Sequence, residues 1–533
     1  MKDDSGHTIP IWMAAAEDPV RPDLRENMRA DVCVVGAGIA GLTTAYLLAK
    51  EGRSVVVLDA GPIGGGETSR TTAHLATALD RRYGDLETLH GQKGSRLAAE
   101  SHTMAIERIA EIAASEQMEC DFEWLEGYLF LGPGDSRETL ENELRAAHRA
   151  GLSQVDYVDC IPLKGAGAVS GLRFPAQAQF NPLKYLHALA RAVERLGGRI
   201  FTDSHADRFE SGVPCRVTTT RGWTVTAKDL VVATNTPVNE LVSVHLKQAA
   251  CRTYAIGVRV PAGSVARALY WDTGNPFHYV RLQIEADREV LIVGGEDHKT
   301  GQEEDTAARF SRLEAWMREF FPMGGEVEFR WSGQVIESID GLAFIGRNSD
   351  SEPHIYIATG DSGNGMTHGT IAGMLLTDLI AGRTNSWTSL YSPTRLKLGA
   401  AAEFLGENAN VAAHFLDHLT PGDRISTNEI GRGEGAVIRR GISKIAAYRD
   451  VKGLLHEHSA VCPHMGCVVA WNSAETTWDC PCHGSRFDIS GKVINGPSIG
   501  NLAPADNQVA GRAEVSGASL GRGSEQDAQV ADG

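Results

Sequence analysis

The segment 31–59 constrains the fold of this chain more than any other part of the sequence. It begins with an apolar run, DVCVVG, continues with the helix-like stretch IAGLTTAYLLAKE, and ends with a second apolar run, SVVVLD. A strand, a glycine-rich turn, a helix and a second strand form a βαβ unit, which is typical of α/β domains. The sequence therefore predicts a Rossmann-type α/β domain that begins near residue 28.

The turn of this unit carries the pattern G-x-G-x-x-G, formed by Gly36, Gly38 and Gly41. The first glycine permits a tight turn, the second lets a pyrophosphate approach the backbone, and the third lets the helix pack closely on the strand. Asp59 ends the second strand, where a carboxylate can bind a ribose hydroxyl pair and disfavours a 2′-phosphate. We therefore expect a dinucleotide other than NADP. The fingerprint alone leaves FAD and NAD open.

Two further glycine-rich segments favour a dinucleotide site. GGGETSRTTAHLAT (64–77) is rich in glycine and hydroxyl groups that could hold a pyrophosphate, and its candidates are Ser69, Thr71 and Thr72. HIYIATGDSGNGMTHG (354–369) predicts a strand, a turn and a second helix start, with the candidates Gly363, Gly365, Met366 and Thr367. The positive end of such a helix could stabilise the negative charge of a reduced flavin.

The rest of the chain alternates between helical and strand-rich regions. Helices are expected at 95–115, 137–150 and 181–198, and a strand-rich region at 215–335. A surface helix is expected at 398–419, and the tripeptide Thr-Pro-Gly that follows it marks a boundary. Short strands follow that boundary, and the small, polar C-terminal tail is expected to be disordered.

The charge balance excludes some classes of function. The chain has 51 Lys and Arg residues against 68 Asp and Glu residues, a net charge of −17, which argues against a nucleic-acid or anionic-membrane partner. The N-terminal sequence lacks a basic stretch followed by an apolar core, so no secretory signal is expected. The long uncharged run 32–49 is short for a membrane span and contains the three glycines of the turn. We expect a cytoplasmic protein without a membrane span.

Four of the nine cysteines crowd together near the C-terminus with two histidines. The pattern is Cys462-Pro-His464, fifteen residues, then Cys480-Pro-Cys-His483. Two thiolates suit one iron of a [2Fe–2S] cluster, and two imidazoles can replace thiolates on the other iron. Zinc is the alternative, although zinc fingers pair cysteine with cysteine and histidine with histidine rather than forming two mixed pairs. Either way, the spacing predicts a metal site.

Several segments together resemble the FAD-dependent amine and amino-acid oxidoreductases, the family of glycine oxidase, sarcosine oxidase and D-amino-acid oxidase. They are ADVCVVGAGIAGLTTAYLLAKEGRSVVVLDAG (30–61), NPLKYLHALARA (181–192), LVVATNTP (230–237), IDGLAFIG (339–346) and the glycine-rich segment at 355–369. The resemblance spans about 25–385 and implies FAD, a nucleotide-binding domain assembled from separated segments, and a substrate domain with a mixed sheet over the flavin. The expected ranges are an N-terminal extension at 1–27, FAD-binding segments at 28–95, 155–240 and 330–385, and a substrate domain at 96–154 and 241–329.

The substrate side is less clearly marked. In PFHYVRLQ (276–283), strand alternation places His278 on one face and Tyr279 and Arg281 on the other. Arg281 could clamp a carboxylate, as arginines do in that family, or pair with a surface acid. His74 is similar to the flavin-linking histidines of some relatives, but its spacing differs, so noncovalent FAD is expected. Further cleft candidates are Tyr254, His298 and His368.

The cysteine-rich region resembles a Rieske domain over about 422–510. CPHMGC (462–467) and CPCHGS (480–485) are similar to its two cluster loops, and NGPSIGNL (495–502) to the loop that covers the cluster. The resemblance implies a [2Fe–2S] cluster with one iron held by two thiolates and the other by two imidazoles. The implied ligands are Cys462, Cys480, His464 and His483.

The same resemblance implies further details of the cluster site. Cys467 and Cys482 occupy the positions of the disulfide that joins the two loops in the respiratory type. Ser485 matches the serine that bonds a bridging sulfur, whereas Phe487 replaces a frequent tyrosine, so one hydrogen bond to the cluster should be missing. The expected ranges are a connector and helix at 386–421, the Rieske domain at 422–512 and a disordered tail at 513–533.

Together these features predict three parts: a Rossmann-type α/β FAD-binding domain, an α+β substrate domain with a mixed sheet, and a small all-β Rieske domain. The leading hypothesis is a dehydrogenase that moves hydride from an amine or amino acid to FAD and passes electrons through the cluster to a protein or quinone acceptor. Two alternatives stay open. One is an oxygen-using oxidase whose cluster is structural or redox-sensing, and the other is an electron-transfer module that receives electrons from a protein partner.

Overall fold

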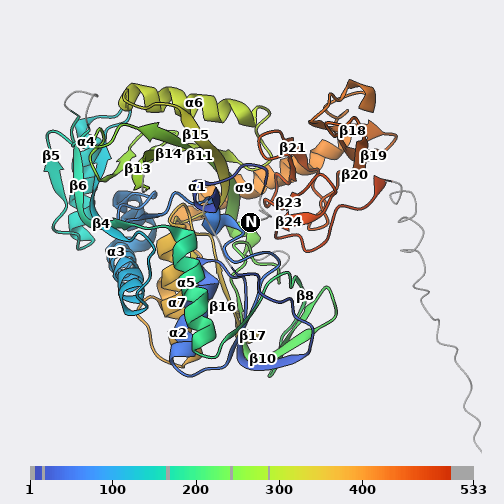
Figure 1. The fold of residues 1–533 in the computed structure, drawn as a ribbon, viewed down its shortest axis with the longest axis horizontal. Helices are drawn as coiled ribbons and strands as arrows, with labels where there is room; N and C mark the ends of the chain where they lie inside the picture. Colours follow the sequence, from blue (N-terminus) through green and yellow to red (C-terminus); the bar gives the residue numbers. More distant parts are fainter. Residues whose placement is uncertain (1–5, 15–18, 164–168, 240–243, 286–287, 506–533) are drawn as a thin grey trace, which may run out of the picture.

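The computed structural model describes residues 6–14, 19–163, 169–239, 244–285 and 288–505. Within them the chain forms two large sheets with their helices and a smaller all-β part near the C-terminus (Figure 1). The tail expected at 513–533 lies outside the described residues. In the ranges given above, no helix is both long enough and apolar enough to cross a lipid bilayer.

The first sheet is built around the predicted βαβ unit. β1 (Met28–Val35) pairs in parallel with β2 (Val55–Leu58) and β10 (Thr224–Val232). Their valine-rich sequences favour strands because β-branched side chains pack well on a pleated surface. The strand order is β16-β17-β10-β1-β2-β7, and β9 and β8 extend it from β10. The remaining strands are β7 (Arg199–Phe201), β8 (Ala206–Glu210), β9 (Cys215–Thr219), β16 (Phe344–Ser349) and β17 (Glu352–Thr359).

Three helices pack together against the first sheet (Figure 1). They are α2 (Ile39–Lys50), α5 (Pro182–Arg195) and α7 (Gly365–Ile380), and α2 contacts both of the others. Asn181 caps α5 by accepting a hydrogen bond from the amide of Lys184 (3.1 Å), and Pro182 suits the first turn. The second half of β1 is buried, with Val32 and Val34 in the core that contains the helices and Cys33 and Val35 in a separate core.

The second sheet is mixed and has the order β15-β11-β14-β13-β12-β4-β6-β3, with β5 beside β6. β12 pairs in parallel with β4, and the other pairs of the described sheet are antiparallel. Its strands are β3 (His74–Leu75), β4 (Glu123–Phe130), β5 (Asp156–Val158), β6 (Gly171–Gln179), β11 (Gln248–Val260), β12 (Leu269–Asp272), β13 (His278–Ile284), β14 (Glu289–Lys299) and β15 (Val327–Ser338). The nearby helices are α3 (Tyr83–Ser115), α4 (Arg137–Arg149) and α6 (Thr306–Phe320).

Some of these placements differ from the ranges expected from the sequence. β5 and β6 were expected in the FAD-binding domain, but β6 pairs with β4 of the second sheet. β15 likewise joins the edge of this sheet beside β11. α6 interrupts a region expected to be strands, and Asp305 caps it by accepting from the amide of Ala308 (3.0 Å). These strand pairings join segments that are far apart in the chain, so local sequence patterns do not predict them.

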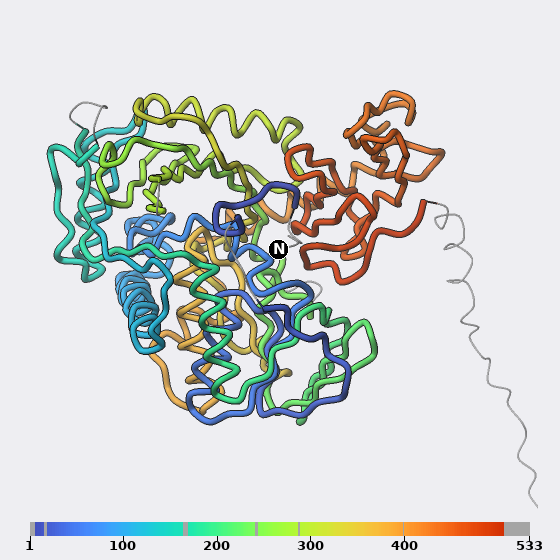
Figure 2. The backbone as a smooth tube through the Cα atoms, in the orientation of Figure 1, coloured from blue at the N-terminus to red at the C-terminus, as the bar shows by residue number. Residues whose placement is uncertain are grey.

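The C-terminal part is all β. The antiparallel sheet β18-β19-β20 and the sheet β21-β22-β23-β24 share one small core, and the first of these sheets packs on a second one. Figure 2 shows this part, in orange to red, beside the main body. The dark-blue N-terminal segment contacts it there, and the amide of His7 donates to the carbonyl of Glu475 (3.1 Å). The strands are β18 (Glu434–Arg440), β19 (Ser443–Arg449), β20 (Leu455–Ser459), β21 (Ala470–Asn472), β22 (Thr477–Asp479), β23 (Arg486–Phe487) and β24 (Val493–Asn495).

Short elements complete the chain. α1 (Ile11–Ala14) packs its apolar residues into the main core, and Trp12 Nε1 donates to the carbonyl of Thr71 (2.7 Å). The predicted helix before the C-terminal part is α9 (Ala401–His414), preceded by α8 (Thr388–Tyr391). The 3₁₀ turns are η1 (Glu67–Arg70), η2 (His245–Lys247), η3 (Leu398–Ala400), η4 (Phe415–Leu419) and η5 (Thr427–Glu429).

Candidate active site and metal centre

The turn between β1 and α2 forms a cradle suited to an anionic group. Gly36 has a φ of +108°, and a Cβ there would collide with the carbonyl of Ala233. A Cβ at Gly41 would collide with the Gly36 carbonyl, so only glycine lets α2 pack this closely on the turn. Gly38 and Ile39 border a cavity, and the positive end of the α2 dipole therefore faces it.

Asp59 also borders this cavity at the end of β2. Its carboxylate accepts hydrogen bonds from the amides of Ala37 (2.6 Å) and Gly61 (2.9 Å). The side chain therefore holds the shape of the glycine-rich turn as well as facing the place where a ribose was expected. Its contact with ribose hydroxyls stays a prediction.

The cavity has a volume of about 760 Å³, which lies in the usual range for small-molecule and cofactor sites. Most of the residues predicted to bind the dinucleotide line it: Gly36, Gly38, Asp59, Thr71, Thr72, Gly363, Gly365 and Met366. The other three predicted residues, Gly41, Ser69 and Thr367, do not line the cavity. Gly41 packs against the turn, and the two hydroxyl groups bind backbone carbonyls. Ser69 donates to the carbonyl of Gly66 (2.9 Å), and Thr367 donates to the carbonyl of Asn364 (3.1 Å).

Residues of strands β11 to β14 of the second sheet, and Phe277 just before β13, also line the cavity. They contribute an aromatic wall in which the ring centroids of Phe277 and Tyr279 are 5.5 Å apart. The ring of His74 lies 5.8 Å from Trp271 and 5.7 Å from Tyr279. The Tyr279 hydroxyl lies 2.7 Å from that of Thr253, which also borders the cavity. We call the region lined by Thr253, Trp271, Phe277 and Tyr279 the substrate end, because the sequence led us to expect the substrate at strand β13.

Three carboxyl groups of the cavity wall have perturbed acidity. Burial raises the pKa of Asp80, Asp297 and Asp361 to about 7 in each case. Neighbouring acids add to this effect, since Glu337 acts on all three. A hydrogen bond from Thr253 partly opposes the rise at Asp297, and the charge of Arg82 does so at Asp80. Carboxyl groups with such pKa values exchange protons near neutral pH.

Of the three leading substrate candidates, His278 and Arg281 do not line the cavity. Arg281 is completely buried, and its Nη1 donates to the carbonyls of Thr72, Ala73 and Phe180 at 3.0–3.2 Å. It holds β13 to neighbouring segments and does not border the cavity, so the expected carboxylate clamp is not formed. His278 stacks on Trp316 on the opposite face of the sheet, with Nδ1 2.9 Å from Asp272. Only Tyr279 of this set lines the cavity.

The other cleft candidates divide in the same way. Tyr254 and His298 bond to each other (2.9 Å) outside the cavity. His368 borders it, but its Nδ1 donates to the carbonyl of Asp361 (2.8 Å), and burial lowers its pKa to about 4. His74 also borders it, and burial, aided by the charge of Arg281, lowers its pKa to about 3. His74 and His368 are therefore neutral at pH 7.

The two predicted cluster loops have matching backbones and lie side by side. The amide of Cys462 donates to the carbonyl of Cys467 (2.9 Å), and that of Cys480 donates to the carbonyl of Ser485 (2.8 Å). A disulfide joins Cys467 to Cys482 with a Cα–Cα distance of 6.5 Å, as the resemblance implied. Three sulfurs, those of the disulfide and of Cys480, lie within 4.8 Å of one another. The disulfide sulfurs are already bonded, whereas Cys462 and Cys480, the two cysteines expected to bind the cluster, are buried and not in a disulfide.

The chemistry of the loops fits a [2Fe–2S] cluster with mixed ligands. A hydrogen bond from the Cys480 thiol lowers the pKa of Cys462, and the amides of His464 and Met465 also donate to its sulfur. The rings of His464 and His483 lie 5.0 Å apart. Both ring nitrogens of His483 are buried and accept or donate no hydrogen bond within the described ranges, as expected for a side chain shaped to bind a metal. Phe487 is completely buried in the same core and carries no hydroxyl donor.

Comparison with known proteins identifies both halves. The family model "FAD dependent oxidoreductase" matches residues 31–379. The chain belongs to this family of oxidoreductases. The model "Rieske [2Fe-2S] domain" matches residues 423–506, so the chain carries FAD chemistry and a [2Fe–2S] cluster site in one polypeptide.

Relatives of this oxidoreductase share both parts or one of them. A Bacillus subtilis (strain 168) protein described as the Rieske 2Fe-2S iron-sulfur protein YhfW is 30% identical over 499 residues, 93% of this chain and 97% of the relative. Gamma-glutamylputrescine oxidoreductase of Escherichia coli (strain K12) is 28% identical over 393 residues, 70% of this chain and 89% of the relative. Glycine oxidase from Geobacillus kaustophilus shares the fold, with a TM-score of 0.59, 18% identity, and coverage of 69% of this chain and all of that one.

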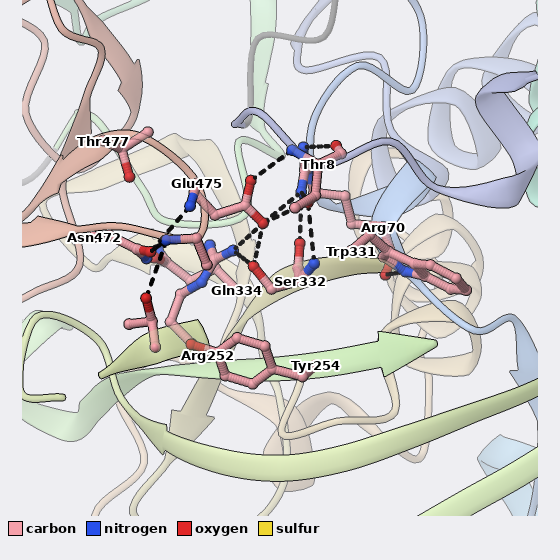
Figure 3. A network of polar contacts seen from close by, with 12 residues as sticks. Thr8, Arg70, Arg252, Tyr254, Trp331, Ser332, Gln334, Asn472, Glu475 and Thr477 are labelled. Carbon is pink, nitrogen blue, oxygen red and sulfur yellow. Dashed lines mark hydrogen bonds and ion pairs between the residues drawn. The ribbon is translucent and has the colours of Figure 1, made fainter. Parts of the chain in front are cut away.

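A buried ionic network joins the Rieske domain to the rest of the oxidoreductase (Figure 3). Glu475 is fully buried, and its Oε1 lies 3.2 Å from Arg70 and 3.3 Å from Arg252. It also accepts from the hydroxyls of Ser332 and Thr8. Burial opposes its ionisation, but the charges of Arg70, Arg252 and Arg486 outweigh that effect and lower its pKa to about 2. Glu475 is therefore a buried carboxylate that binds four segments of the chain: the N-terminal segment, η1, β11 and β15.

The Rieske domain also completes the cavity of the oxidoreductase. Residues 492–496 and 498–501 line it, and Asn495 Nδ2 donates to Glu67 of η1 (3.2 Å). Gly333, Gln334 and Val335 of β15 also line the cavity, and Gln334 Nε2 donates to the carbonyl of Gly484 in the second cluster loop (3.0 Å). The resemblance to two separate families gave no signal for this docking, because it depends on contacts between their surfaces.

Proposed function

We propose that this oxidoreductase is a dehydrogenase of amines or amino acids whose electrons pass to its own Rieske cluster. Bound in the cavity, FAD would take a hydride from the substrate, and the cluster would carry single electrons onward to a protein or quinone acceptor. The similarity to gamma-glutamylputrescine oxidoreductase and the shared fold with glycine oxidase support the first half of this proposal. The proposed cluster ligands are Cys462 and Cys480 on one iron and His464 and His483 on the other.

One observation carries the proposed electron route. Gln334 borders the cavity, and its side chain bonds to the backbone of Gly484, which directly follows His483. A single residue of β15 therefore spans the wall between the cavity and the second cluster loop. A redox centre on each side of so thin a wall would exchange electrons within one chain, without a diffusing partner.

The ring of His245 in η2 supports the same route. Its centroid lies 5.1 Å from that of His464 and 5.8 Å from that of His483. The histidine edge of the cluster site therefore faces the main body of the oxidoreductase. His483 is 5% exposed, whereas His464 is more open. We propose that an external acceptor approaches the cluster from the side of His464, the more exposed of the two histidines.

Anaerobic reduction of the full-length protein tests the proposal. After an amine or amino acid is added, flavin absorbance near 450 nm should bleach first, and the electron paramagnetic resonance signal of a reduced mixed-ligand cluster should follow. Gln334→Ala should slow the second step and leave the first unchanged. Gln302→Ala is the matched control, because Gln302 also donates to a carbonyl of the Rieske domain, that of Pro481 (3.3 Å), but does not line the cavity. A flavin that bleaches beside a cluster that stays oxidised would show that the cluster is not on the path.

A further inference from the structure

The substrate end of the cavity contains acids and aromatic rings. Asp297 of β14 and Asp80 border it together with Trp271, Phe277 and Tyr279. The charges of the two acids act on each other, since Asp80 contributes to the raised pKa of Asp297. An ammonium group close to carboxylates and over aromatic faces gains both ionic and cation–π stabilisation.

Asp297 has an acceptor atom without a partner. The Tyr279 hydroxyl lies 2.7 Å from that of Thr253, which in turn donates to the carboxyl of Asp297. Within the described residues, Asp297 Oδ1 is shielded from solvent and makes no hydrogen bond. A buried carboxylate oxygen that is left unpaired is costly. Since Asp297 borders the cavity while this oxygen is shielded, a bound molecule would meet the other part of its side chain.

Cations of the cavity wall lie elsewhere. Among the described residues that line it, the Arg and Lys side chains are Arg70, Arg221 and Lys492. Arg70 binds Glu475, and Arg221 pairs with Asp23. Lys492 comes from the Rieske domain and acts on His205, which also lines the cavity. None of the three belongs to the strands that form the substrate end.

Other charged groups act on the two acids from nearby. Glu337 and Asp361 act on Asp80, and Arg82 opposes them from outside the cavity wall, where its Nη2 donates to the carbonyl of Asp272 (2.9 Å). Arg281, the residue expected to clamp a carboxylate, is bonded to backbone carbonyls instead. A substrate carboxylate at this end would face acids without a clamp.

We infer that the substrate end selects a cationic amine that has no carboxylate beside its amino group, with Asp297 as the acceptor of the ammonium and Trp271 and Tyr279 as its aromatic walls. This inference rests on the proposed function, because it names the substrate class of the same cavity. α-Amino acids, whose carboxylate is one carbon from the amine, are then poor substrates.

Binding of two matched probes to the FAD-loaded, full-length protein tests the inference. Benzyltrimethylammonium and benzoate carry the same ring and opposite charges, and their dissociation constants follow from calorimetry and from flavin difference spectra. We expect the cation to bind at least tenfold more tightly, and Asp297→Asn to remove that preference. Asp350→Asn, on the exposed turn between β16 and β17, is the control and should change neither constant.

The outcomes separate this inference from the proposed function. Benzoate binding as tightly as the cation, or a cation affinity unchanged in Asp297→Asn, overturns the inference. If Asp297→Asn does not retain flavin, Trp271→Leu provides the same comparison. Faster bleaching by phenylalanine than by phenethylamine also overturns the inference but leaves the proposed dehydrogenase standing. Selective cation binding with no bleaching by any amine or amino acid supports the cation site and contradicts the proposed function.

Discussion

Glu475→Gln should strongly destabilise the docked arrangement of the Rieske domain. The side chain is completely buried, and its carboxylate lies 3.2 Å from Arg70 and 3.3 Å from Arg252. Its pKa is about 2 in the folded chain against an ordinary 4.5, and at 1.36 kcal/mol per pKa unit this corresponds to about 3 kcal/mol in favour of the folded, ionised state. Glutamine also removes the charge that faces two buried arginines, and breaking a buried pair costs about 3–5 kcal/mol. These two figures describe the same interaction, so the expected loss is about 3–5 kcal/mol in total.

Urea unfolding of the full-length protein measures this loss. Tryptophan fluorescence at pH 7, with FAD fixed at one concentration, gives the free energy of unfolding of each variant. Glu319→Gln is the control, because Glu319 is exposed on α6 and should change stability by less than about 0.5 kcal/mol.

The pH dependence of the loss has a defined sign. Because the folded pKa is depressed, the stabilisation by Glu475 is fully present above about 4.5 and declines as the pH falls towards about 2. The difference in the free energy of unfolding between the wild type and Glu475→Gln should therefore be constant from pH 7 to about 5 and become smaller below that. A difference in the free energy of unfolding of less than about 1 kcal/mol at pH 7 would show that the buried ion pairs of Glu475 do not stabilise the docked Rieske domain as proposed.

Three further predictions concern the cluster loops. Protein purified anaerobically from iron-replete cells should contain two irons per chain, and zinc in their place, measured by plasma emission, would contradict the ligand assignment. Cys467→Ser should release iron faster to a chelator than the wild type, because the disulfide holds the two loops together; equal release rates would show that the loops do not need it. Phe487→Tyr should raise the reduction potential of the cluster by tens of millivolts in film voltammetry, because an added hydroxyl donor stabilises the reduced form more. An unchanged or lowered potential there would contradict the expectation.

Local motifs explain why much of the nucleotide cradle and the cluster loops could be predicted. Gly36 needs a positive φ, and Gly41 needs the absence of a Cβ, and both requirements act within a few residues of one another. The disulfide between Cys467 and Cys482 likewise follows from a resemblance carried by two short loops. In such cases the residue type and the local backbone conformation determine each other, so sequence alone is informative.

The substrate end was harder to predict because its residues come from separate strands. Strand alternation placed Tyr279 and Arg281 on one face, but carbonyls of Thr72, Ala73 and Phe180 hold Arg281 away from the cavity. No local pattern shows that these carbonyls converge there. Asp297 gave no signal either, because an acid at the end of a strand is usually exposed, and its position follows from the pairing of β14 with β11 and β13.

A chain shortened to end at Pro421 should lose FAD affinity, although the family match ends earlier, at residue 379. Removing the Rieske domain takes away residues 492–496 and 498–501 from the cavity and opens one of its walls to water. It also removes Glu475, so that Arg70, whose η1 segment lines the cavity, is left buried without its carboxylate. We expect FAD to dissociate at least tenfold more readily from the shortened chain, measured by the recovery of free flavin fluorescence on dilution. The point variant Glu475→Gln, which keeps the domain, should show an intermediate effect. Equal FAD affinity in the shortened and full-length chains would mean that the Rieske domain closes the cavity without contributing to cofactor binding.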